Sequence, residues 1–113
     1  MRTKPSTLPT PRIAIRGEFG VDVADLVTMK LERVARHAHR PILDVHVRLT
    51  RDEHAAGNPP VTVEVNLDLN GRQVRAETGA RSARDALDRV VDRLVRQLDD
   101  QPVPHRGRRA ARR

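Results

Sequence analysis

The stretch from Ser82 to Leu98 constrains the fold most, because it has the periodicity of an amphipathic α-helix. Its apolar side chains recur every three or four residues along one face: Ala83, Ala86, Leu87, Val90, Val91, Leu94 and Leu98. Ser82, three residues before Asp85, is typical of a helix start, since its hydroxyl can accept a hydrogen bond from the first turn. At about 100° per residue, the polar side divides into two adjacent strips: Asp85, Asp88, Asp92 and Asp99, and Arg89, Arg93 and Arg96.

The net charge of the chain is concentrated at its two ends. The 113 residues contain 22 lysines and arginines and 15 aspartates and glutamates, which gives a formal charge of +7. Residues 1–11 hold two of the basic side chains, residues 105–113 hold five, and neither segment contains an acid. The segment 12–104 is therefore formally neutral. Any cationic surface on it has to arise from the sorting of charges and not from an excess.

Length and composition predict one small domain with flanking segments. We expect a flexible arm over residues 1–11, a folded domain over 12–99 and a Pro/Arg-rich basic tail or linker over 100–113. The chain has no cysteine, no apolar run of membrane-spanning length and no signal-peptide-like apolar region at its N-terminus. These features predict a cytoplasmic protein without a membrane partner.

The remaining patterns predict the element order β-α-β-β-β-α. Strands are expected over Arg12–Arg16, Ile42–Thr50, Val61–Leu69 and Arg72–Thr78, and a helix from Asp22 to about His39, before Pro41. Leu43, Val45, Val47 and Leu49 should face the core from the second strand, and Val74 and Ala76 from the fourth, which Gly79 should end. Asn70-Gly71 predicts a type I′ hairpin turn. Alternating strands favour an α+β fold: a four-stranded mixed sheet with both helices on one face and water on the other.

The first predicted helix also separates apolar from basic side chains. Its apolar stripe consists of Val27, Leu31, Val34, Ala35 and Ala38, and its basic side chains are Lys30, Arg33, Arg36, His37 and Arg40. Three acid–arginine pairs have the i,i+4 spacing of ordinary exposed ion pairs: Asp85 with Arg89, Asp92 with Arg96, and Glu32 with Arg36.

The sequence contains almost no pattern that indicates a catalytic or metal-binding site. The five histidines, at positions 37, 39, 46, 54 and 105, have no metal-ligand spacing and are expected to be exposed. Ser82 is better explained as a helix cap than as a nucleophile, and no glycine-rich phosphate loop is present. We therefore predict a protein that is not an enzyme and needs no cofactor, metal or small-molecule substrate.

Binding to nucleic acid is better supported, through phosphates and not through base stacking. Phe19 is the only aromatic residue, so the aromatic platforms of single-strand RNA-binding domains are missing. The candidate surface joins Lys30, Arg33, Arg36 and Arg40 of the first helix to Arg89, Arg93 and Arg96 of the second. Patterning alone leaves three interpretations open: ordinary solvated faces, a general binder of structured or double-stranded RNA, and a regulatory module that binds an acidic protein.

The chain resembles the ribosome hibernation-promoting factors, or ribosome-associated inhibitors (the σ54-modulation/S30EA family), over roughly residues 13 to 98. The matching stretches include Ile13-Ala14-Ile15-Arg16-Gly17, Lys30-Leu31-Glu32-Arg33-Val34 and Asn70-Gly71-Arg72. The most specific match is Ala86-Leu87-Asp88 followed by Asp92-Arg93-Leu94-Val95-Arg96-Gln97-Leu98, which is similar to the family's A-I-D-x-x-x-D-K-L-x-R-Q-L.

This resemblance implies a fold similar in layout to double-stranded RNA-binding domains and a function in bacterial ribosome hibernation. It implies binding to 16S rRNA of the small subunit and to the 70S ribosome, in the channel where mRNA and tRNAs pass, so that translation is inhibited during stress or dormancy. The family motifs assign rRNA binding to Lys30, Arg33, Arg93 and Arg96. With the neighbouring basic positions, the full candidate set is Lys30, Arg33, Arg36, Arg40, Arg84, Arg89, Arg93, Arg96, Arg106, Arg108 and Arg109.

The sequence departs from the family pattern at two aromatic positions and at its C-terminal end. Arg84 replaces the aromatic residue that commonly precedes A-I-D, and Leu26 replaces a tyrosine early in the first helix. Nothing in residues 99–113 resembles the C-terminal domain with which long family members pair ribosomes, so this stretch does not support homodimerisation. Residues 100–113 fit either the tail of a short form or the linker of a longer protein.

Overall fold

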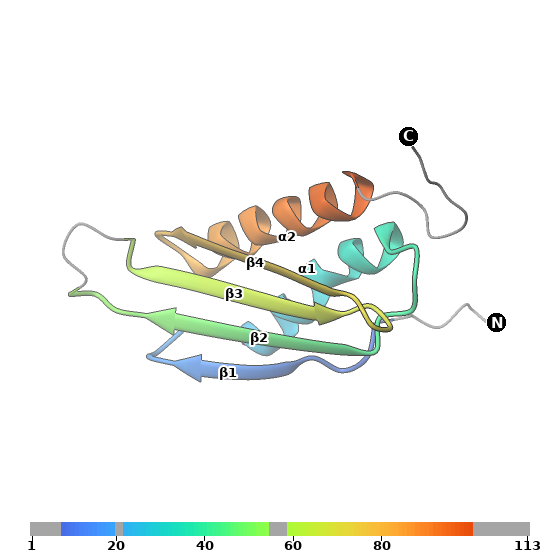
Figure 1. The fold of residues 1–113 in the computed structure, drawn as a ribbon. Coiled ribbons are helices and arrows are strands. Elements are labelled where there is room, and N and C mark those ends of the chain that lie inside the picture. The colour runs from blue at the N-terminus through green and yellow to red at the C-terminus, as the bar shows by residue number, and fades with distance from the viewer. Residues whose placement is uncertain (1–7, 20–21, 55–58, 101–113) are drawn as a thin grey trace.

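The computed structural model describes residues 8–19, 22–54 and 59–100, which form a four-stranded sheet with two helices against one face (Figure 1). The elements follow in the order β1 (Arg12–Arg16), α1 (Val23–His37), β2 (Asp44–Arg51), β3 (Val61–Asp68), β4 (Gln73–Ala80) and α2 (Ala83–Asp100). The predicted β-α-β-β-β-α order is confirmed. Neither helix in these ranges has the length and apolar composition needed to cross a bilayer.

The sheet is mixed, with the strand order β1-β2-β3-β4. β1 pairs with β2 in parallel, whereas β2 with β3 and β3 with β4 are antiparallel. The register aligns Ile13, Val47, Val65 and Ala76 in one row across the sheet. Because side chains alternate between the two faces of a strand, this row and its apolar neighbours turn together toward the helices.

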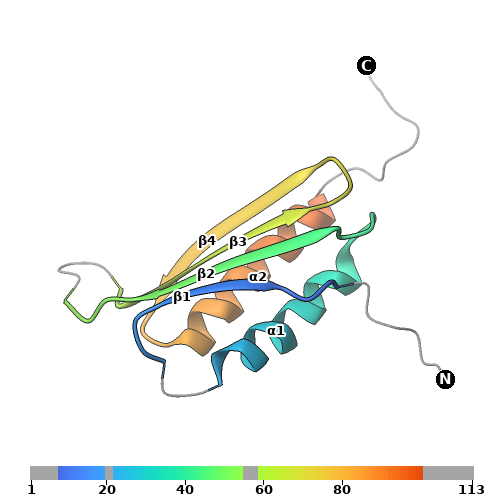
Figure 2. The same ribbon diagram turned by 90° about the horizontal axis from the view of Figure 1, so that it is seen from below.

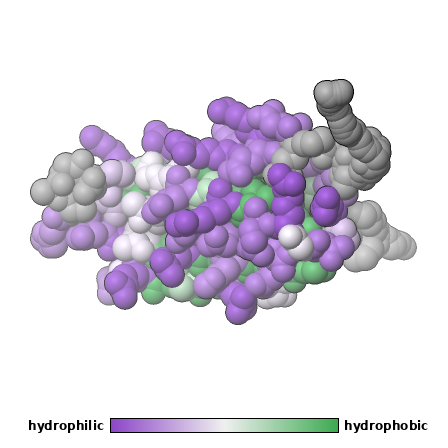
Figure 3. Space-filling model, viewed as in Figure 1, coloured by the Kyte–Doolittle hydropathy of each residue, from purple (hydrophilic) through white to green (hydrophobic). Residues whose placement is uncertain are grey.

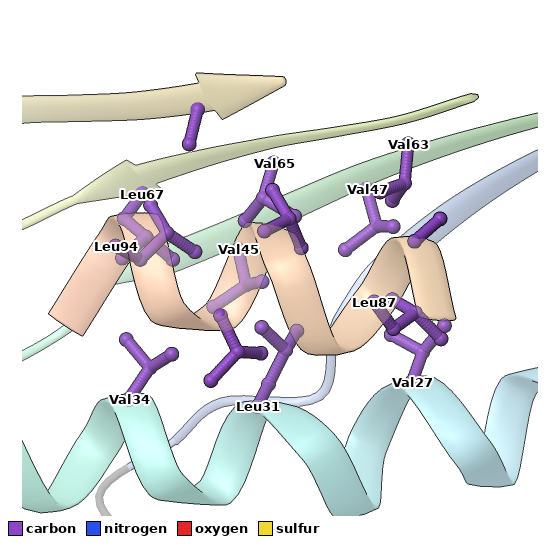
Figure 4. Close-up of a cluster of buried hydrophobic side chains, with 14 of the residues drawn as sticks. Val27, Leu31, Val34, Val45, Val47, Val63, Val65, Leu67, Leu87 and Leu94 are labelled. Carbon is purple, nitrogen blue, oxygen red and sulfur yellow. The ribbon is translucent and has the colours of Figure 1, made fainter. Parts of the chain in front are cut away.

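Both helices cover the same face of the sheet and run in the same direction (Figure 2). Val27, Leu31 and Val34 of α1 point toward the strands and α2, where the apolar side chains of β2 and β3 meet Leu87 and Leu94 (Figure 4). Leu31, Leu67, Leu87 and Leu94 are fully buried. Truncation of such a leucine to alanine typically costs about 2–5 kcal/mol, so this core holds the helices in place.

The helix starts follow the capping residues predicted from the sequence. The Asp25 N–H donates to the Asp22 side chain at 3.5 Å, and the Asp85 N–H donates to the Ser82 hydroxyl at 3.1 Å. α1 ends at His37, two residues before the predicted end, and Ala38 is already extended. The chain has left the helix before it reaches Arg40, the residue that Pro41 keeps out of the helical region.

The hairpin between β3 and β4 has the predicted turn. Asn70 and Gly71 both have positive φ angles, of 57° and 97°, as a type I′ turn requires. The Leu69 N–H donates to the Arg72 carbonyl at 2.7 Å, and the Gly71 N–H donates to the Asp68 carboxylate at 3.2 Å. The register of β3 and β4 is therefore fixed at the turn.

Two details of the strands differ from the prediction. Leu43 does not face the core: β2 begins only at Asp44, Leu43 is 54% exposed, and Ile42 is buried instead. Gly79 does not end β4, which continues to Ala80. Its lack of a side chain serves packing, since a Cβ atom at Gly79 would lie 2.5 Å from the ring of Pro59.

The other face of the sheet is polar, as predicted, and it is mostly hydrophilic where it faces the viewer in Figure 3. Its centre is Glu64, which pairs with Arg48 at 3.4 Å and also with Arg75. Four arginines (Arg12, Arg16, Arg48 and Arg75) and four acids (Asp44, Glu64, Asp68 and Glu77) project from this face. The charges on this face therefore balance, so the sheet does not supply a cationic surface.

Candidate nucleic-acid interface

Three side-chain contacts connect the two helices along their shared edge, two of them ion pairs and one a hydrogen bond between a histidine and a carboxylate, and we call this set the interhelical ladder. Lys30 Nζ lies 2.6 Å from Asp88 Oδ1, Arg33 Nη1 lies 2.7 Å from Asp92 Oδ1, and His37 Nδ1 lies 3.0 Å from Asp99 Oδ1. Because the helices run in parallel, each turn of α1 faces the corresponding turn of α2. Three of the four acids in the acidic strip of α2 therefore point toward α1, although about half of each side chain remains exposed to solvent.

The ladder corrects the prediction of ion pairs within each helix. Asp92 binds Arg33 across the helices and not Arg96, and neither Asp85 with Arg89 nor Glu32 with Arg36 forms a pair in the described ranges. For Asp92, the Arg33 guanidinium on the neighbouring helix lies within hydrogen-bonding distance of the carboxylate, so it replaces Arg96 one turn away. Lys30 and Arg33 thus have part of their charge neutralised.

Five arginines of the candidate set have neither an ion pair nor a hydrogen bond within the described ranges. They are Arg36, Arg40, Arg84, Arg93 and Arg96. Arg93 and Arg96 project from the exposed side of α2, and Arg36 from the side of α1 opposite its buried stripe. Arg40 lies beyond the end of α1. The structure thus places cationic side chains on the outward surfaces of both helices, with the interhelical ladder between them.

Arg89 has a structural contact that the other outward arginines lack. Its Nη1 donates to the Gly79 carbonyl at 3.0 Å, and two turns further along α2 the Gln97 Nε2 donates to the Arg75 carbonyl at 2.9 Å. Both acceptors belong to β4, the edge strand beside α2. An unpaired strand edge invites pairing with other chains, and these two side chains cover part of it.

The tail arginines of the candidate set, Arg106, Arg108 and Arg109, lie outside the described residues, as does most of the predicted arm. Leu8, inside that predicted arm, packs against the hydrophobic core. The described residues contain no group of three or more His, Cys, Asp or Glu side chains placed to hold a metal ion. His46 and His54 are exposed, whereas His37 takes part in the interhelical ladder.

The two positions that depart from the family pattern, Leu26 and Arg84, lie together at one cavity. It has a volume of about 430 Å³ and lies between the first turns of the two helices. Phe19 and Met29 also line it, and Met29 is 58% exposed. The sequence patterns did not single out Met29, although an apolar residue on the polar side of α1 was a visible signal.

The fold defines a class of α+β domain in which two parallel helices cover one face of a mixed sheet. Within that class, the chain belongs to the Sigma 54 modulation protein / S30EA ribosomal protein family, whose model matches residues 17–101. This is a family of ribosome-associated proteins that are not enzymes, so the resemblance and the prediction of a non-enzyme are confirmed.

Solved structures agree with this assignment. The chain is similar to the N-terminal domain of Thermus thermophilus Protein Y, with 31% identity, a TM-score of 0.61, and coverage of 77% of this chain and 91% of that one. A ribosomal subunit interface protein from Coxiella burnetii has the same fold, with 17% identity, a TM-score of 0.62, and coverage of 79% and 92%. No curated protein matches the sequence.

Proposed function

We propose that this protein is a ribosome hibernation factor that binds 16S rRNA in the mRNA and tRNA channel of the small ribosomal subunit. It binds there both in the free small subunit and in the 70S ribosome. The bound protein occupies the space that initiation requires and so inhibits translation during stress or dormancy. The setting is the bacterial cytoplasm. Binding uses electrostatic and shape complementarity and involves no chemical reaction.

The observation that carries this proposal is the position of Arg93 and Arg96. Both belong to the family motif at the end of α2, both project to solvent, and neither has a partner among the described residues. A guanidinium without a protein partner retains its full capacity to bind a phosphate. Membership of the ribosome-associated family and the 31% identity to a Protein Y domain support rRNA as the source of those phosphates.

The charge distribution supports recognition of the RNA backbone over recognition of sequence. Phosphate contacts fix the position of a protein on RNA, whereas sequence is recognised through base edges and stacking. Outward arginines on two neighbouring helices match the first mode. Lys30 and Arg33 strengthen this surface less than their number suggests, because Asp88 and Asp92 neutralise part of their charge.

The test is co-sedimentation with purified small subunits and 70S ribosomes over a series of salt concentrations. The variant Arg93→Glu/Arg96→Glu should fold normally and lose binding, because two phosphate contacts become repulsive. The matched control is Arg16→Glu/Arg72→Glu, which changes the charge equally at two exposed arginines, on the sheet and in its turn, that form no ion pair with another described residue. It should bind like the wild type. For the wild type, the logarithm of the binding constant should fall by about 0.7–0.9 per phosphate contact for each tenfold increase in salt concentration.

Competition with free duplex RNA separates the ribosomal function from its alternatives. Saturable binding at one copy per small subunit in the presence of duplex RNA supports the hibernation function. Displacement by the duplex would indicate a general binder of structured RNA. Binding that depends little on RNA and resists nuclease treatment would indicate an acidic protein partner. Equal binding by both double variants would overturn the role given to α2.

A further inference from the structure

The groove between the helices changes character at its N-terminal end. From Lys30 onward the interhelical ladder closes it with ion pairs. One turn earlier on each helix, Leu26 and Arg84 occupy the positions corresponding to Lys30 and Asp88, and Arg84 forms no ion pair with any residue that the structure describes. Because a leucine cannot bind the guanidinium, the groove stays open here and ends in the 430 Å³ cavity.

The cavity combines an apolar interior with charged side chains at its rim. Phe19, Leu26 and Met29 supply apolar surface, and Met29 is the most exposed large apolar side chain of the described residues, at 58%. The exposed side chains of Arg84 and Asp25 lie at the rim, and Asp22 and Arg51 complete the charged lining, with the Arg51 guanidinium 4.9 Å from the centre of the Phe19 ring. A volume of this size suits a small planar group. An exposed methionine on an otherwise charged helix surface indicates a binding contact more than a packing role.

We propose that this cavity holds one unstacked base of the bound RNA, with the adjoining phosphate on Arg84 and the edge of the base at Asp25. The inference rests on the proposed function, since it places the cavity on the same RNA-facing side of the helices. Unstacked bases are the part of RNA that proteins recognise specifically, through apolar surfaces and arginine planes. A nucleotide also combines an apolar ring with an anionic group, which matches Met29 and Leu26 beside Arg84.

The acidic residues at the rim predict which base is preferred. Asp22 and Asp25 both line the cavity, and the interaction between their carboxyl groups raises the pKa of Asp25. Donors placed beside these oxygens relieve the repulsion. Guanine presents two adjacent N–H donors on one edge, and a carboxylate accepts both. The cavity should therefore prefer guanine over adenine, cytosine and uracil.

The chain is well suited to a direct test, because it contains two methionines and one phenylalanine. Protein labelled with ¹³C at the methionine methyls and at the para carbon of the phenylalanine ring gives one signal for Phe19 and one for Met29. Titration with GMP should move the Met29 and Phe19 signals saturably. AMP, CMP and UMP should produce the same shifts of the Met29 and Phe19 signals only at higher concentrations. If none of the four nucleotides moves Met29 and Phe19, the proposal is wrong.

Two substitutions separate the roles of the rim residues. Asp25→Asn should remove the preference for GMP, because an amide offers one acceptor and one donor. Arg84→Gln should weaken all four nucleotides by a similar factor, because it removes the phosphate contact. If both variants bind all four nucleotides like the wild type, the cavity does not recognise a nucleotide in this way.

Binding to ribosomes distinguishes failure of this inference from failure of the proposed function. Met29→Gln should weaken binding to small subunits by about fivefold or more, the loss expected for one base contact. The control Leu43→Gln alters another exposed apolar residue, outside the helices, and should bind normally. If Met29→Gln binds like the wild type while Arg93→Glu/Arg96→Glu does not bind, the base site is wrong and the function stands. If the wild type does not bind ribosomes, the proposed function fails and the nucleotide titration still decides the cavity.

Discussion

Single charged residues fasten the short strand β1 to the sheet. β1 has only five residues and pairs only with β2, so each side-chain contact across this pair contributes to its attachment. The Arg12 guanidinium lies 2.6 Å from the Asp44 carboxylate on β2, and its hydrogen bond lowers the pKa of Asp44 below the ordinary value of 3.8. Asp25, at the start of α1, has a raised pKa because of Asp22. The pKa values of Asp25 and Asp44 are thus shifted in opposite directions.

These opposite shifts predict opposite effects of pH on stability. Unfolded Asp44 binds a proton at higher pH than folded Asp44, so its stabilising effect is complete above 3.8 and is lost as the pH falls through the folded pKa. Folded Asp25 binds a proton more readily than unfolded Asp25, so it lowers stability as the pH rises above 3.8. Urea unfolding across the acid range should show less acid destabilisation below 3.8 in Asp44→Asn. The Asp25→Asn variant should not show the fall in stability as the pH rises above 3.8. Parallel behaviour of the two variants would contradict the assignment.

The elements were largely predictable from the sequence, whereas their contacts were not. Strict alternation defined β3, and three- and four-residue spacing defined both helices. The interhelical ladder depends on how α1 and α2 are rotated about their own axes, which no periodicity within one helix specifies. Leu43 shows the same limit, because the sequence alternation includes this residue, whereas β2 begins at Asp44 and the Leu43 side chain is exposed. The sequence also located the outward arginines of α2, but not which of its aspartates would neutralise Lys30 and Arg33.

The interhelical ladder predicts that one acid of α2 restrains RNA binding. Asp92→Asn removes the partner of Arg33 and leaves its guanidinium available to a phosphate. Affinity for small subunits should rise, and the salt dependence should steepen by about one phosphate contact. The unfolding free energy should fall by less than about 1 kcal/mol, because both side chains are about half exposed.

Asp100→Asn is the matched control for the Asp92 variant. Asp100 is an exposed acid at the end of α2 that pairs with no cation in the part of the chain that the structure describes, so its substitution makes the same change in charge without releasing a described arginine. It should change affinity less than Asp92→Asn does. Equal effects of the two substitutions would mean that the ladder does not restrain Arg33. Filter binding at several salt concentrations measures both variants.

At the scale of the whole molecule, the net positive charge lies in the terminal segments, whereas the cationic surface of the domain depends on how its balanced charges are arranged. The segment 12–104 carries 15 basic and 15 acidic side chains, and the sheet face and the ladder use many of them in compensating pairs. What remains is a small set of outward arginines beside one open cavity. The cavity could not be predicted from sequence, because Phe19, Met29, Arg51 and Arg84 come from four separate segments. We therefore expect selectivity among RNA targets to reside in the folded domain.

This division predicts the effect of deleting residues 105–113. The deletion removes five arginines and no acid, so it should weaken binding to small subunits and to free duplex RNA by similar factors and reduce both salt dependences. The ratio of the two affinities should stay the same, since the outward arginines of the helices are intact. Sedimentation of the shortened chain with small subunits, with and without duplex competitor, measures this ratio. If the deletion abolishes ribosome binding and spares duplex binding, recognition resides in the tail and not in the helices.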